Sequence, residues 1–290
     1  MGYRIVVIAS RSKLDCKMDY LVVRTSEKTS RIHLDEIAVL IIESTAVSLT
    51  AYLLAELTAR KIKVIFCDEK HYPSSELVPY YGSHDTSRRI RDQLKWTEQA
   101  RDFVWAEIVR GKLRGQVWVL SADHAEAAEK LEGYLREIVP GDATNREGHA
   151  AKVYFNALFG KGFSRSDECP VNASLDYGYS LLISAFAREI VACGYITPLG
   201  IHHGNTFNAF NLACDLVEPF RPYVDAAVVK MAPRQFGKEE RATLANTLNH
   251  IVRIVGQEHR MLSAIHIYSV SIFNALAEND TERLKMPAYE

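Results

Sequence analysis

The most informative stretch of this chain reads GIHHGNTFNAFNLACDLVEPFRP, residues 200–222. It combines a double histidine between two glycines with a helix-forming run that ends in two acids, Asp215 and Glu218. The acids stand three residues apart, so both carboxylates would project from one face of a helix. Pro219 and Pro222 follow directly and predict that this helix ends there.

Two carboxylates at a helix C-terminus oppose the helix dipole and repel each other, at a cost of a few tenths to about 1 kcal/mol. A bound cation would offset both effects. The alternative is that Asp215 and Glu218 are solvated or pair with Arg221, and for an arbitrary helix this alternative is the commoner one. The neighbouring double histidine favours the cation.

The two histidines, His202 and His203, lie in a predicted loop before the helix expected at 206–218. An imidazole can be aimed freely from such a loop, although a histidine is more often a hydrogen-bonded structural residue than a ligand. Adjacent histidines cannot readily share one metal ion. We therefore expect one of the pair to be a ligand and the other to support it.

A third candidate lies in TNREGHAA, residues 144–151, which opens a helix expected over 144–159. Thr144 and Glu147 have the spacing of a capping box, in which the glutamate returns to its own helix start. From local sequence alone, a cap and a ligand are equally good interpretations of Glu147. A glycine and two alanines follow it, and such small residues would let another element approach closely.

The most basic stretch reads RRIRDQLK, residues 88–95, with further cations after it. It is a candidate phosphate track, but interleaved acids make a solvated helix face the commoner interpretation. The candidate DNA-binding residues are Arg88, Arg89, Arg91, Lys95 and Arg221.

The 290 residues carry a formal net charge of -1, with 48% hydrophobic and 24% charged residues. This composition is typical of a globular enzyme and excludes a protein that coats nucleic acid by its overall charge. Five scattered cysteines without a CxxC pair indicate neither disulfides nor a zinc cage. No apolar run of about 20 residues and no signal-peptide cleavage region are present, so we expect a cytoplasmic protein without membrane contact.

Secondary-structure patterns divide the chain. Short runs rich in Val and Ile predict a small sheet or sandwich at 3–9, 20–25, 31–34, 37–42 and 61–67, with one helix at 47–60 capped by Ser44 or Thr45. Residues 73–86 are rich in Pro, Ser and Gly and predict a linker. Apolar residues at three- and four-residue spacing then predict helices at 86–110, 121–138, 144–159, 173–193, 206–218, 238–255 and 258–278. The polar residues 279–290 predict a flexible tail.

Three blocks together resemble the Cas1 family, the CRISPR-associated adaptation integrase and endonuclease: REGHAAKVYF at 146–155, HHGN at 202–205 and FNLACDLVEPFRP at 210–222. The resemblance extends over the whole chain, and its length and the segment 72–79 resemble the type II form. It implies an α+β protein: a small N-terminal β-sandwich dimerisation domain at 1–72, the linker at 73–86, a larger all-α catalytic domain at 87–278 and the tail.

The resemblance also implies roles for single residues. Glu147, His203 and Glu218 match the family's catalytic metal ligands, which would hold Mg²⁺ or Mn²⁺, and Asp215 matches a nearby supporting acid. His202 is then a second supporting residue. Many relatives outside type II carry Asp where this chain has Glu218.

The implied reaction joins the 3′-hydroxyl ends of a prespacer duplex to the CRISPR repeat by transesterification. The implied partners are double-stranded DNA, a second copy of the chain, Cas2 in a hetero-hexamer of two Cas1 dimers around a Cas2 dimer, and in type II systems Cas9 and an accessory adaptation protein. The small net charge fits this function if several subunits together form the DNA surface.

Two other functions stay open. A metal-dependent nucleotide phosphohydrolase would use the same ligand types, and His84-Asp85 forms the dipeptide that such enzymes favour. A catalytically silent, DNA-architectural member of the fold would keep the architecture without the chemistry.

Overall fold

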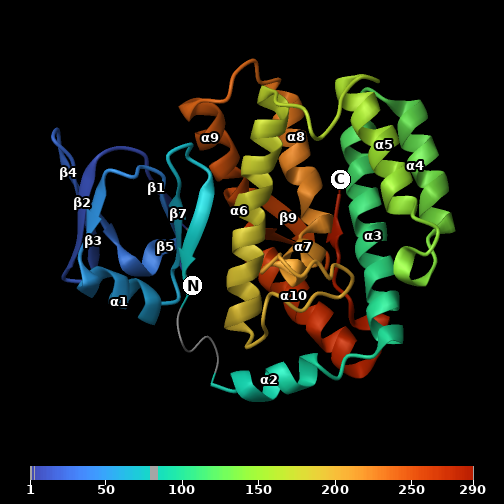
Figure 1. Ribbon diagram of the computed structural model, residues 1–290, viewed down its shortest axis with the longest axis horizontal. Coiled ribbons are helices and arrows are strands. Elements are labelled where there is room, and N and C mark those ends of the chain that lie inside the picture. The colour runs from blue at the N-terminus through green and yellow to red at the C-terminus, as the bar shows by residue number, and fades with distance from the viewer. Residues whose placement is uncertain (1, 3, 79–83, 290) are drawn as a thin grey trace. The chain divides into compact units, whose positions relative to one another are not determined.

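The structure is a computed structural model that describes residues 2, 4–78 and 84–289. The chain forms two compact units, residues 1–84 and 85–290 (Figure 1). The first unit is rich in strands and the second in helices, which confirms the predicted α+β class with a β-rich N-terminal domain before a helical one.

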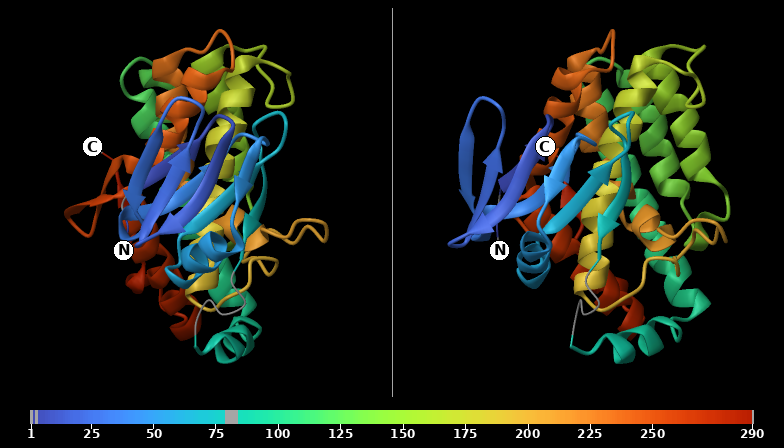
Figure 2. Two further views of the ribbon diagram at one scale, coloured as in Figure 1. Left: turned by 90° about the vertical axis from the view of Figure 1, so that its left-hand side faces the viewer. Right: turned by 60° about the vertical axis from the view of Figure 1, so that its left-hand side comes forward.

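The first unit holds two four-stranded sheets, whose strands face the viewer in the left view of Figure 2. In one sheet β1 (Arg4–Ile8), β5 (Ile37–Ile42) and β7 (Lys63–Cys67) run parallel, and β8 (Pro73–Leu77) pairs antiparallel with β7. In the other, β4 (Thr29–His33), β3 (Tyr20–Arg24) and β2 (Ser12–Lys17) are antiparallel, and β6 (Val47–Leu49) runs parallel to β2.

Both sheets and helix α1 (Ala51–Ala59) contribute to one hydrophobic core, with members such as Leu14, Leu21, Leu40 and Leu53.

The helix predicted at 47–60 begins later than expected, at Ala51. Residues 47–49 alternate in a β pattern and extend a sheet edge, while Thr50 caps the helix by accepting a hydrogen bond from Leu53 N at 3.2 Å.

The linker predicted at 73–86 is wrong in its first part, because Pro73–Leu77 forms strand β8. Pro73 begins an edge strand, where its missing N–H costs no ladder bond. Glu76 in this strand pairs with the buried Lys63 of β7. Residues 79–83 of the predicted linker lie outside the described residues, and Thr86 already begins helix α2.

The second unit is built from nine α-helices within residues 84–289. They are α2 (Thr86–Gln93), α3 (Glu98–Leu120), α4 (Ala125–Glu137), α5 (Arg146–Phe159), α6 (Pro170–Ala192), α7 (Asn211–Leu216), α8 (Arg221–Met231), α9 (Lys238–Ala245) and α10 (Met261–Glu278). Large aromatic side chains fill its core, among them Trp105, Tyr177, Phe186 and Tyr268.

The helical unit is not all-α, because it carries a three-stranded sheet of β10 (Gln257–Arg260), β9 (Ile251–Ile254) and β11 (Pro287–Ala288). The helix predicted over 238–255 stops at Ala245. Val255 and Gly256 have positive φ angles of 54° and 71° and form a two-residue hairpin turn between β9 and β10.

The predicted flexible tail, 279–290, is ordered over its described residues. Its strand β11 pairs with β9, and the Tyr289 ring packs against Trp118 and Tyr223. The Tyr289 hydroxyl donates a hydrogen bond to the carbonyl of Pro219. Sequence polarity did not reveal this packing, because two aromatic partners from other elements provide it.

The helix predicted over 206–218 spans Asn211–Leu216, so it ends close to the predicted point. The two prolines after Glu218 also lie in the first turns of new helical segments, which the sequence did not predict. The 3₁₀ turn η3 (Glu218–Phe220) has Pro219 as its second residue, and α8 has Pro222 as its second residue. Proline is tolerated in the first turn, where its missing N–H has no helical partner. None of the helices in the described part of the chain has the length and hydropathy needed to cross a membrane.

Candidate active site

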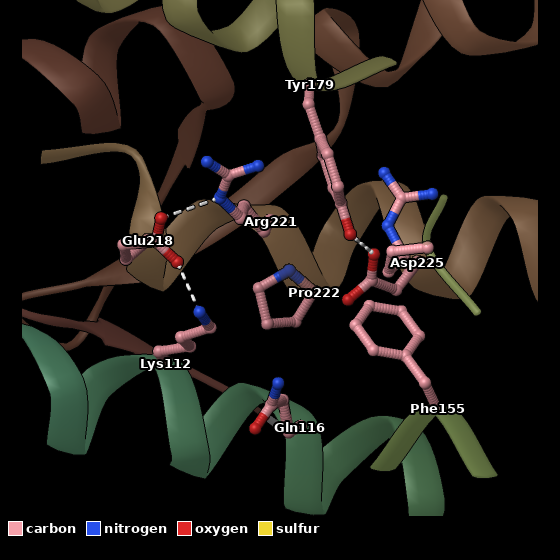
Figure 3. Close-up of a pocket in the computed structure, with 9 residues that line it drawn as sticks. Lys112, Gln116, Phe155, Tyr179, Glu218, Arg221, Pro222 and Asp225 are labelled. Carbon is pink, nitrogen blue, oxygen red and sulfur yellow. Dashed lines mark hydrogen bonds and ion pairs between the residues drawn. The ribbon is translucent and has the colours of Figure 1, made fainter. Parts of the chain in front are cut away.

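Helices α3 and α5 and the turn η3 bring Lys112, Glu147 and Glu218 together. The Lys112 ammonium donates a hydrogen bond to Glu147 Oε1 at 2.6 Å and lies 2.6 Å from Glu218 Oε2 (Figure 3 shows the second contact). Two of the three predicted ligands thus share one cation, although they are 71 residues apart in the sequence.

Glu147 does not cap its own helix. Asp142 accepts hydrogen bonds from the N–H groups of Arg146 and Glu147 at 2.9 Å each, and the Asn145 side chain accepts from Gly148 N. Thr144, the predicted capping partner, lies before the helix start. Because these groups satisfy the helix terminus, the Glu147 carboxylate is left to contact Lys112, and the capping-box alternative is wrong.

Glu218 is a buried carboxylate with two cationic partners. Arg221 Nε donates to its Oε1 at 2.8 Å, and Lys112 lies at its Oε2. Burial raises the pKa of Glu218, but the charges of Arg221 and Lys112 outweigh it and lower the pKa to about 2. The alternative of an ion pair with Arg221 is therefore correct for Glu218, whereas a solvated acid is not.

Asp215 is fully buried and organises the double-histidine loop. Its two oxygens accept hydrogen bonds from the N–H groups of Ile201, His202 and His203 at 2.6, 3.1 and 3.0 Å. His203 Nδ1 also donates to Asp215 Oδ1 at 2.6 Å. This bond raises the pKa of His203 against the opposing effect of burial, and it leaves Nε2 as the ring nitrogen available to a ligand.

The two histidine rings have different surroundings. His202 stacks on Trp105 of α3, with ring centroids 4.4 Å apart and planes 2° apart, whereas His203 meets the same indole edge-on at 5.7 Å. The two imidazoles are nearly perpendicular to each other, at 89°. This geometry agrees with separate roles for the pair.

The donor set suits a hard divalent cation. Glu218 is buried, and the partner of its Oε2 is the Lys112 ammonium at 2.6 Å, so this oxygen already faces a cation. The charges of Glu218 and Glu147 also contribute to the raised pKa of His203. As arranged here, no three His, Cys, Asp or Glu side chains in residues 4–78 and 84–289 form a ready metal cage. The predicted residues fit Mg²⁺ or Mn²⁺ in donor type and charge, and the ligand set stays a prediction.

The predicted DNA-binding residues divide into two groups. Arg88, Arg91 and Lys95 lie exposed on or just after α2, and Arg89 is half-buried, with Arg88 and Arg89 paired to Asp85. Arg221 is also half-buried but is paired with Glu218, its guanidinium 4.5 Å from the centroid of the Tyr179 ring. We therefore group Arg221 with Lys112, Glu147 and Glu218, and we call these four residues the carboxylate cluster.

Two supporting residues were missed from the sequence. Gln93 of α2 donates from Nε2 to the carbonyls of Ile196 and Leu199 and accepts from Ile196 N, which holds the segment before the histidines. Lys112 belongs to the cations that follow the basic stretch 88–95, and its sequence context there gives it no separate role. A signal was present, because Lys112 follows the buried Trp105 and Ile108 at helical spacing, which places a lysine on the apolar face of α3.

Comparison with known proteins shows the family of this chain. The family model for CRISPR associated protein Cas1 matches residues 5–251. A CRISPR-associated endonuclease Cas1 from Neisseria meningitidis serogroup C is 32% identical over 293 residues, covering 99% of this chain and 96% of the relative. One from Pyrobaculum aerophilum is 31% identical and covers 73% of this chain and 76% of the relative.

Solved structures share the fold. A Cas1 protein from Thermotoga maritima has a TM-score of 0.76 at 18% identity, covering 95% of this chain and 97% of that one. A casposase bound to integration product has a TM-score of 0.75 at 19% identity, covering 97% and 92%. With the family model spanning most of the sequence and a full-length relative above 30% identity, this chain belongs to the Cas1 family of CRISPR-associated proteins.

Proposed function

We propose that this protein is a metal-dependent DNA endonuclease and integrase of CRISPR spacer acquisition, which joins the 3′-hydroxyl ends of a prespacer duplex to the CRISPR repeat by transesterification. One observation carries the proposal: Glu147 and Glu218, far apart in sequence, converge on a single cation beside His203 in a Cas1-family chain. The similarity to relatives named as endonucleases supports it.

In this proposal Glu147, Glu218 and His203 Nε2 would hold Mg²⁺ or Mn²⁺. When bound, such an ion would supply neutralisation of charge on the phosphodiester. Arg221 keeps Glu218 ionised and oriented, and Asp215 fixes the ring orientation of His203. The protein itself contributes positioning and charge, which are the main requirements of phosphoryl transfer.

The proposed partners follow from the same assignment. They are double-stranded DNA, a second copy of the chain through the β-rich unit, Cas2 in a hetero-hexamer and, for the type II form, Cas9 and an accessory adaptation protein. Solved Cas6-RT-Cas1–Cas2 complexes contain chains that share this fold, which supports the Cas2 assignment. Arg88, Arg89, Arg91 and Lys95 are the proposed DNA contacts outside the cluster.

Replacement of Glu147 tests the function. Glu147→Ala should abolish metal-dependent strand transfer into a repeat-containing plasmid while dimer formation and the circular dichroism spectrum stay unchanged, because a ligand is lost and the helix start keeps its Asp142 and Asn145 caps. Glu132→Ala, an exposed acid on α4, is the matched control and should stay active.

Full strand transfer by Glu147→Ala would refute the ligand assignment. A nucleotide-hydrolysis screen of the same proteins addresses the phosphohydrolase alternative, for which Asp85 is the relevant acid. In the structure, Asp85 pairs with Arg88 and Arg89 at the start of α2.

A further inference from the structure

Lys112 holds the position at which two carboxylates need a cation. Its side chain is only 13% exposed, and its ammonium is 2.6 Å from both Glu147 Oε1 and Glu218 Oε2. A divalent ion bound by the same two carboxylates would meet this ammonium at close range. Two like charges a few ångströms apart in a buried site repel strongly, so Lys112 and a metal ion exclude each other from this position.

A second place for the ammonium lies one helical turn away. Gln116 follows Lys112 by four residues on the same face of α3, is 2% exposed, and has an Oε1 without a hydrogen-bond partner among the described residues. An unpaired buried acceptor is costly and needs an explanation. Helical side chains lean toward the N-terminus, which directs Gln116 toward the turn of Lys112.

Both residues line one pocket of about 190 Å³, together with Arg221, Pro222 and Asp225 (Figure 3). The pocket borders the Lys112–Glu218 ion pair, so the Lys112 side chain can rotate into it while the backbone of α3 stays in place. A flexible four-carbon stem and three donors suit a lysine to such a change of partner.

We infer that Lys112 is a positioning residue with two partners: it holds Glu147 and Glu218 together as their counter-ion, and it moves to Gln116 Oε1 when a divalent ion takes its place. This inference rests on the proposed function, in which those carboxylates bind metal. Lys112 thereby weakens metal binding by competing for the site, and Gln116 strengthens it by receiving the displaced ammonium.

The two roles predict effects of opposite sign from residues one turn apart. Full-length protein is stripped with a chelator, and Mn²⁺ binding is measured by isothermal titration calorimetry. Lys112→Met should bind Mn²⁺ about tenfold more tightly, since the competing charge is gone. Gln116→Leu should bind it about tenfold more weakly, because the displaced ammonium has no acceptor. Arg114→Met, an exposed cation on the same helix, is the matched control and should bind as the wild type does.

Thermal unfolding supplies a second readout. Without metal, Lys112→Met should unfold at a lower temperature than the wild type, because Glu147 and Glu218 lose their shared cation, and excess Mn²⁺ should raise its midpoint more than that of the wild type. If Lys112→Met does not fold, Lys112→Gln keeps an uncharged N–H donor group and should shift Mn²⁺ affinity in the same direction.

Unchanged or weaker Mn²⁺ binding by the folded Lys112 variant would overturn the inference, as would unchanged or tighter binding by Gln116→Leu. Either result leaves the proposed function intact if the wild type binds Mn²⁺ and Glu147→Ala does not. Absence of Mn²⁺ binding by the wild type would overturn both the inference and the metal assignment on which it rests.

Discussion

Asp225 is a buried carboxyl whose oxygens accept hydrogen bonds from Tyr154 at 2.9 Å and Tyr179 at 2.5 Å. Burial raises its pKa to about 6, against the opposite effect of these hydrogen bonds. The folded state therefore binds this proton more tightly than the unfolded chain, where the pKa is about 3.9. The contribution of Asp225 to stability is present at low pH and is lost as the pH rises from about 4 to about 6.

Asp225→Asn cannot titrate and should lack this dependence. Between pH 4 and pH 7, the unfolding free energy of the wild type should fall relative to that of the variant by about 3 kcal/mol, which corresponds to the difference between the two pKa values. Urea unfolding at a series of pH values measures it. If the unfolding free energies of the two proteins change with pH in parallel, the raised pKa of Asp225 is contradicted.

The double histidine offers a second test at this scale. His203→Ala should abolish strand transfer at every Mn²⁺ concentration, because the predicted ligand is lost. His202→Ala should reduce the rate by about 10- to 100-fold, as is typical for residues that orient a ligand. If His202→Ala is inactive throughout while excess Mn²⁺ restores His203→Ala, the two roles are reversed.

Single residues were predictable where a motif marks them. Glu147, His203 and Glu218 stood out in the sequence, and the structure brings Glu147 and Glu218 onto one ammonium. Lys112 escaped notice because its function depends on two partners from distant segments. A contact of this kind exists only in the folded chain, where α3 passes both of them.

At the scale of elements, α3 packs closely against the segment that carries Glu218. A Cβ placed on Gly115 would lie 2.6 Å from Pro222 Cγ and 2.8 Å from Tyr289 Cζ. Gly111 has a similar approach to Pro219, at 3.1 Å. These two glycines let the backbones come near enough for Lys112, between them, to reach Glu218.

Gly115→Ala should therefore move α3 away from this segment. We expect a loss of about 1–3 kcal/mol in unfolding free energy from overpacking, together with reduced strand transfer. Gly133→Ala on α4 is the matched control, since no atom lies within 4 Å of its added Cβ. It should stabilise the protein by about 0.5–1 kcal/mol through helix propensity. Equal stability of the two variants in urea unfolding would argue against close packing at Gly115.

Apolar periodicity predicted α6 and α10 closely, because each buries many regularly spaced side chains. It was wrong for the helix expected at 86–110: the structure has α2 ending at Gln93 and α3 running from Glu98 to Leu120. The short elements were harder. Strand β8 is a polar edge strand, and β9 and β10 depend on one hairpin turn. Pairing between separate segments, and not local propensity, decides such strands.

At the scale of the molecule, a formal net charge of -1 gives the single chain little general attraction for DNA. We expect duplex affinity to rise strongly when Cas2 is added, because assembly would bring several basic patches together. The affinity should fall steeply with salt as phosphate counterions are released. Fluorescence anisotropy with and without Cas2, over a salt series, measures both effects.

Lys95, which lies exposed just after α2, allows the DNA surface itself to be tested. Lys95→Ala should reduce the slope of log affinity against log salt by about 1 if Lys95 contacts a phosphate. Lys238→Ala, at the start of α9, should leave it unchanged. Tight, salt-insensitive binding by the chain without Cas2 would contradict an assembled DNA surface.

The architecture of the whole chain was predictable from the order of its patterns, a β-rich front followed by a helical remainder. The last residues were not. Their strand β11 and the packing of Tyr289 depend on β9, Trp118 and Tyr223, which lie in three other parts of the chain. The sequence of a short, polar segment does not indicate that partners elsewhere in the chain will order it.

The carboxylate of Asp215 binds three successive peptide N–H groups, those of residues 201–203. Every amino acid except proline supplies such a group, so the anchorage does not depend on which side chain occupies position 201. It depends on the count of residues and on the absence of proline. An engineer who grafts this loop onto another scaffold must therefore preserve its length and keep proline out of positions 201–203, and a reporter is better inserted after His203.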